Sequence, residues 1–148
     1  MKLALLDVNV LIALAWPVHV HHRVAHQWFA RNAAFGWVTC PLTQLAFVRI
    51  SSNPKIIRNA VSPRQAIELL GRNISHPNHI FWPDDLSFAE ASSMLTETLV
   101  SHRQVTDRYL LALARSKNGK LATLDRKMAD LLLATGSPSE ILELLPTD

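Results

Sequence analysis

Five short apolar segments recur along the chain, and longer segments with helical spacing separate them. The apolar segments cover residues 2–6, 36–40, 79–82, 120–124 and 141–145, the lengths expected of buried strands. Strands that alternate with helices form parallel sheets whose two faces are covered by helices. The sequence therefore predicts an α/β fold with a short central parallel sheet of about five strands flanked by helices.

The segments between the predicted strands carry helix start and stop signals. Pro41 suits the first turn of a helix that runs to about residue 51, and Ser62–Pro63 begins a helix that ends near residues 71–73. Ser87 and Glu90 have the spacing of a capping box. Further helices are predicted over residues 9–16, 19–32, 109–116 (capped by Ser101 or Thr106) and 127–133.

The length of 148 residues predicts a single domain over 1–148. The lone cysteine, Cys40, excludes an internal disulfide and a zinc site built on several thiolates. No apolar run is long enough to cross a bilayer, and Asp7 stops the apolar run at the amino terminus, so we expect a cytoplasmic protein with no membrane partner. Charged residues are scarce, at 18%, which predicts an apolar patch covered by a partner or a second copy.

Basic residues are concentrated in two parts of the chain. Residues 1–67 hold seven Lys or Arg with Asp7 as the one acid, and residues 103–127 hold seven Lys or Arg with Asp107 and Asp125 as the two acids. Such stretches can neutralise a phosphate backbone, although isolated basic residues more often form surface ion pairs of little energetic value. The candidates to contact a nucleic-acid backbone are Arg49, Lys55, Arg58, Arg103, Arg108 and Arg126.

Three isolated acids lie where a shared site would form. Asp7 and Asp125 follow predicted strands, and Asp107 lies at the start of a predicted helix. Ligands of open α/β sheets bind at the carboxyl ends of the strands, and carboxylates that converge there require a cation. Oxygen ligands with no Cys or His cluster select Mg²⁺ or Mn²⁺, which points to metal-dependent phosphodiester cleavage. Taken singly, each aspartate is better explained as a turn former or a helix cap, but the three together, in matching local contexts, favour the functional interpretation.

Four segments, in this order, resemble the PIN-domain family: residues 5–12 (LLDVNVLI), 39–44 (TCPLTQ), 105–107 (VTD) and 121–125 (LATLD). The similarity spans essentially the whole chain and is greatest to VapC toxins of bacterial toxin–antitoxin modules, of the kind common in mycobacteria. It implies a three-layer PIN-like fold and a Mg²⁺- or Mn²⁺-dependent endoribonuclease. It also implies a VapB-type antitoxin as partner and a homodimer.

The resemblance assigns roles to single residues. Asp7, Asp107 and Asp125 match the first, third and fourth metal-binding acids of the family and are the predicted catalytic residues. Asn9 matches the small polar residue beside the first acid, which orients that carboxylate or a metal-bound water. Thr106 and Thr123 match polar neighbours that hydrogen-bond the site.

Gln44 stands where the family commonly has its second acid. Its carbonyl oxygen can approach a metal but brings no negative charge, so we expect weaker binding of at least one ion; alternatively, Gln44 only bonds a neighbouring group. The missing acid leaves open a second function, a PIN-fold module that binds antitoxin or RNA without cleavage. A phosphoacceptor receiver domain is a third possibility, but it requires a paired acid after the first strand and a lysine ending the last one, and neither is evident.

Overall fold

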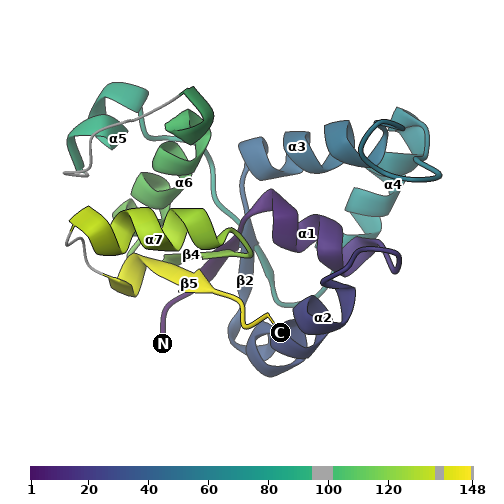
Figure 1. The fold of residues 1–148 in the computed structure, drawn as a ribbon, viewed down its shortest axis with the longest axis horizontal. Helices are drawn as coiled ribbons and strands as arrows, with labels where there is room; N and C mark the ends of the chain where they lie inside the picture. Colours follow the sequence, from purple (N-terminus) through teal and green to yellow (C-terminus); the bar gives the residue numbers. More distant parts are fainter. Residues whose placement is uncertain (95–101, 136–138, 148) are drawn as a thin grey trace.

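The computed structural model describes residues 1–94, 102–135 and 139–147, which build one five-stranded sheet between two groups of helices (Figure 1). The strand order is β3-β2-β1-β4-β5, and every neighbouring pair is parallel. The strands are β1 (Ala4–Leu6), β2 (Trp37–Thr39), β3 (His79–Phe81), β4 (Lys120–Thr123) and β5 (Leu142–Leu144). The predicted α/β class and its short parallel sheet are confirmed.

Each face of the sheet packs on its own set of helices. Leu5 and Leu121 point to a core shared with α5 (Phe88–Met94), α6 (Val105–Ser116) and α7 (Arg126–Thr135). Leu6 and Trp37 point to the opposite core, formed with α1 (Val8–Ala15), α2 (His22–Asn32), α3 (Pro41–Ser51) and α4 (Pro63–Ile74). Alternating side chains of strands point to opposite faces, so strands of three or four residues still serve both cores. Three short 3₁₀ turns complete the described elements: η1 (Ala33–Phe35), η2 (His102–Gln104) and η3 (Ser139–Ile141).

Most helix starts follow the sequence signals. Pro41 opens α3, and Ser62 caps α4 through a hydrogen bond from the Gln65 amide to its hydroxyl. The start of α6 was predicted wrongly: the helix begins at Val105, Gln104 occupies the cap position and Thr106 lies inside the first turn, while Ser101 lies outside the described residues. The cause is η2, which leads directly into α6 and removes the need for a side-chain cap.

The parallel order places the carboxyl ends of β1, β2 and β4 at one edge of the sheet. Leu6 pairs with Ala122 across the β1–β4 ladder, and the Asp7 amide donates to the Ala122 carbonyl (2.9 Å). Asp7 consequently lies beside Thr123, at the point where the chain leaves β1 to begin α1. No helix among the described residues is long and apolar enough to traverse a bilayer.

Candidate functional site

Asp7 is the buried centre of the edge formed by β1 and β4, with only 5% of its surface exposed. It caps α1, since its Oδ1 accepts the Val8 amide (2.8 Å), and its Oδ2 accepts the Thr123 hydroxyl (2.8 Å). Burial raises the pKa of this carboxyl, the bonds from Thr123 and Val8 lower it in part, and the Asp125 carboxylate raises it further. Asp7 is therefore a carboxylate held in place but poorly compensated in charge.

Asn9 and Thr123 connect the start of α1 to the end of β4. Asn9 Nδ2 donates to Thr123 Oγ1 (3.1 Å) and reaches Asp7 Oδ2 (3.4 Å), while Asn9 Oδ1 accepts the Leu124 amide (3.1 Å). The fully buried Thr123 hydroxyl donates to Asp7 and also accepts the Asp125 amide (3.0 Å). Asn9 and Thr123 together fix the segment that carries Asp7 against the segment that carries Asp125.

Asp107 contributes the third carboxylate from the first turn of α6. Its pKa is raised to about 6 by burial and by the negative charges of Asp7 and Asp125. Asp125 follows β4, and its Oδ1 accepts the Lys127 amide (3.0 Å) at the start of α7. The three predicted acids, from three distant parts of the sequence, therefore share one electrostatic site.

The donor set fits a hard divalent cation. It is made of carboxylate oxygens. Asp125 raises the pKa of Asp7, and Asp7 and Asp125 together raise the pKa of Asp107, so a cation would relieve the repulsion. Within the described residues, no three His, Cys, Asp or Glu side chains already form a closed metal-binding group. The aspartates are thus a shared negative site rather than a preformed cage.

Gln44 is hydrogen-bonded to the end of β2, whereas Thr106 is exposed to solvent. Gln44, in the second turn of α3, donates from Nε2 to Thr39 Oγ1 (2.9 Å) at the end of β2. Thr39 Oγ1 also lies 2.7 Å from Nε2 of His79. Thr106 is exposed on α6, and its side chain makes no hydrogen bond with the described residues.

The three foremost arginine candidates divide into exposed and buried ones. Arg49 lies exposed on α3, and Arg126 is exposed at the start of α7, where its Nη2 reaches Thr147 Oγ1 (3.4 Å). Arg108 is buried, and its Nη2 donates to the Ser92 carbonyl on α5 (3.0 Å). A buried guanidinium that holds α5 on α6 is a packing group, which argues against Arg108 as an RNA contact.

Sequence reasoning missed Thr39 and His79. Thr39 begins one of the four family-like segments, but nothing near it in sequence indicates its bond to His79, which is 40 residues away. The contact depends on the pairing of β2 with β3, where Trp37 lies opposite His79.

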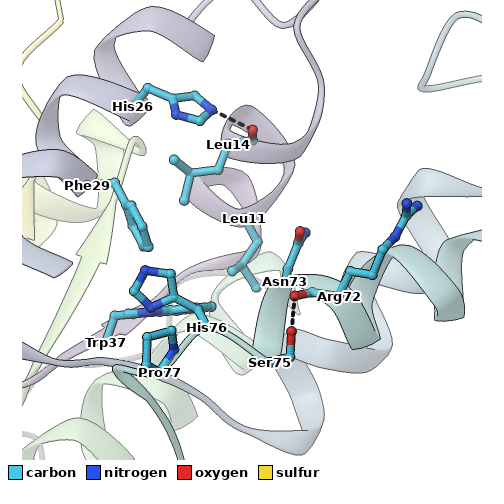
Figure 2. Close-up of a pocket in the computed structure, with 10 residues that line it drawn as sticks. All are labelled: Leu11, Leu14, His26, Phe29, Trp37, Arg72, Asn73, Ser75, His76 and Pro77. Carbon is cyan, nitrogen blue, oxygen red and sulfur yellow. Dashed lines mark hydrogen bonds between the residues drawn. The ribbon is translucent and has the colours of Figure 1, made fainter. Parts of the chain in front are cut away.

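A separate pocket of about 440 Å³ lies between α1, α2 and the end of α4 (Figure 2). Its wall includes Phe29, Trp37 and His76, whose rings meet edge to face at centroid distances of 5.4–6.0 Å. His26 lies at the rim, where its Nε2 bonds the Leu14 carbonyl (2.9 Å). None of the three aspartates lines this pocket, so it is distinct from the carboxylate site.

The chain is similar to known proteins in both sequence and fold. The PIN domain family model matches residues 4–131. Ribonuclease VapC39 of Mycobacterium tuberculosis is 46% identical over 127 residues, which are 86% of this chain and 91% of that protein. Ribonuclease VapC38 of the same organism is 43% identical over 143 residues, 97% of this chain and 98% of that protein. In fold, the crystal structure of VapBC2 from Rickettsia felis bound to a promoter DNA fragment matches with a TM-score of 0.61 at 14% identity, covering 97% of this chain and 99% of that one.

Proposed function

The chain belongs to the PIN-domain family, and from that membership we propose that it is a metal-dependent endoribonuclease, the toxin of a VapBC-type toxin–antitoxin module. The relatives that match most of the chain carry the name ribonuclease VapC, at 40–46% identity. The alternative of a binding module without cleavage gains no support from these relatives.

The observation that carries the proposal is the convergence of charge on Asp107. Its pKa of about 6 reflects burial first and then the charges of Asp7 and Asp125, so acids that lie 100 residues before and 18 residues after Asp107 in the sequence act on it. A site that holds unfavourable charge in the absence of a ligand is prepared for a cation. Mg²⁺ or Mn²⁺ is the cation that we propose, because the donors are oxygen atoms.

The roles of the residues follow from their contacts. Asp7, Asp107 and Asp125 would hold the ion, which when bound supplies a water of lowered pKa and positive charge beside the scissile phosphate. Thr123 and Asn9 keep the Asp7 carboxylate oriented through their bonds to Oδ2. Arg49 and Arg126 are exposed and would attract the RNA backbone, a contact that positions the substrate without reading its sequence.

The proposed partners are a VapB-type antitoxin and a second copy of the chain. The VapBC2 structure from Rickettsia felis, to which the chain is similar in fold, supports the first. Exposed apolar side chains on α3 and α4 support a covered surface, since Leu45 and Ile67 are 63% and 58% exposed. A small neighbouring gene that encodes a DNA-binding antitoxin would support the module.

Cleavage assays on candidate RNAs test the activity. We expect Mg²⁺- or Mn²⁺-dependent cleavage that is abolished in D7N and D107N. The matched control is D130N, which removes an exposed aspartate on α7. Cleavage by D7N at the rate of the parent chain would identify a contaminating nuclease, whereas tight RNA or antitoxin binding with no turnover in either metal would establish the binding module instead.

A further inference from the structure

Three polar side chains form a hydrogen-bonded row across the β2 end of the sheet. Gln44 Nε2 lies 2.9 Å from Thr39 Oγ1, and Thr39 Oγ1 lies 2.7 Å from His79 Nε2. The row starts on α3, passes through a fully buried hydroxyl on β2 and ends on the edge strand β3. Buried hydroxyls require partners, and here the two partners come from different elements.

The chemistry of the groups determines the direction of one of the two bonds. An amide nitrogen can only donate, so the Thr39 hydroxyl accepts from Gln44; towards His79 Nε2 the hydroxyl can donate its single proton or accept with its second lone pair, depending on which ring nitrogen carries the proton. His79 can accept that proton only while its Nε2 carries none. Burial and the neighbouring His76 lower the pKa of His79, which favours the neutral ring.

The row leaves one end of Gln44 available. Its Nε2 is used by Thr39, whereas its Oε1 has no hydrogen-bond partner among the described residues and is not enclosed by them. Gln44 is the fourth residue of α3, the helix that follows β2, and β2 pairs with β1, the strand that immediately precedes Asp7. A glutamate at this position could not donate to Thr39, since its carboxylate can only accept the one hydroxyl proton.

We propose that Thr39 and His79 are positioning residues that hold the Gln44 amide with its carbonyl oxygen free, as a neutral ligand for the divalent ion at the aspartate site. The inference rests on the proposed function and explains how this chain accommodates glutamine where its family commonly has an acid. Gln44 touches the ion, and Thr39 and His79 act only through Gln44.

Direct Mn²⁺ binding, measured from the paramagnetic resonance signal of free Mn²⁺, tests the proposal without reference to cleavage. T39V should weaken binding about fivefold, the ratio that corresponds to one ordinary hydrogen bond, and T39S should restore it. Q44L should weaken binding to a similar extent, and T39V should have no further effect when combined with Q44L. The proposal would be overturned if T39V weakened Mn²⁺ binding equally in the parent chain and in Q44L. It would also be overturned if T39V alone left Mn²⁺ binding unchanged.

A second pair of variants, at the half-exposed His79, tests the same hydrogen-bonded row even if T39V fails to fold. H79Q keeps a polar group that can bond the Thr39 hydroxyl and should bind Mn²⁺ as the parent chain does, whereas H79F should resemble T39V. Equal affinities of H79F and the parent chain would contradict the role of His79. If the parent chain itself binds no Mn²⁺, the proposed function fails and this inference with it; if it binds but the variants do not differ, only the inference fails.

Discussion

Removing the charge of Asp107 should stabilise the metal-free protein at neutral pH. Asp107 has a folded pKa of about 6, above its ordinary value of 3.8, because burial and the charges of Asp7 and Asp125 disfavour the carboxylate. A carboxyl whose pKa is raised by folding stabilises the fold while it is protonated, and this contribution is lost as the pH rises from 3.8 through about 6. The parent chain therefore carries an electrostatic penalty at pH 7.5 that D107N lacks.

The size of the effect follows from the pKa difference. A pKa of about 6 against 3.8 corresponds to about 3 kcal/mol if the full shift is felt. Asp107 is only partly buried, so solvent screening reduces this to about 1.5–2 kcal/mol. The carboxylate also lies in the first turn of α6, where the helix dipole stabilises it by about half a kcal/mol. The expected net gain for D107N is about 1–1.5 kcal/mol at pH 7.5.

Urea unfolding in the presence of a chelator measures the gain at several pH values. We expect the advantage of D107N to decrease as the pH falls through about 6 and to vanish below 3.8. Adding Mn²⁺ should make the parent chain more stable than D107N, because the parent chain binds the ion more tightly and is therefore stabilised more by it. A gain that does not change with pH would refute the electrostatic origin, and D130N, the exposed control, should show no gain.

Three further changes have expected outcomes. T123V removes the hydroxyl that bonds Asp7, Asn9 and the Asp125 amide. It should lower the free energy of unfolding in urea by about 1–3 kcal/mol and reduce Mn²⁺ affinity. T106V, at an exposed position, should change neither quantity. R108M should destabilise the protein by about 1–3 kcal/mol in thermal melts while leaving RNA affinity in filter binding unchanged; a selective loss of RNA binding would restore Arg108 as a contact. G119A should destabilise by about 1–3 kcal/mol in urea unfolding, since its Cβ would lie 2.5 Å from the Trp82 ring and 2.8 Å from the Leu3 carbonyl oxygen; a Tm equal to that of the parent chain would contradict this.

The parts of the site that the sequence predicts well are those fixed by local chain geometry. Asp7 and Asp125 follow apolar strands, and parallel strands must present their carboxyl ends at one edge, so the order of the elements alone brings them near each other. To predict that Asp107 lies near them, one must also know that α6 leads into β4 and that β4 pairs with β1. The family-like segments supply this information. Whether Arg108 is buried or exposed depends on which side of α6 packs against α5. Its position beside Asp107 in the sequence does not indicate that side.

Gln44 illustrates why the remaining part needs coordinates. In sequence it is a departure from an acid, and the loss of negative charge is the one consequence that can be worked out from residue type. In the fold its amide nitrogen is bonded to a hydroxyl that is itself bonded to a histidine on another strand, and an acid cannot make that first bond as a donor. The substitution is thus coupled to Thr39 and His79 through strand pairing, so that its effect on the metal site depends on two residues that no local pattern connects with it.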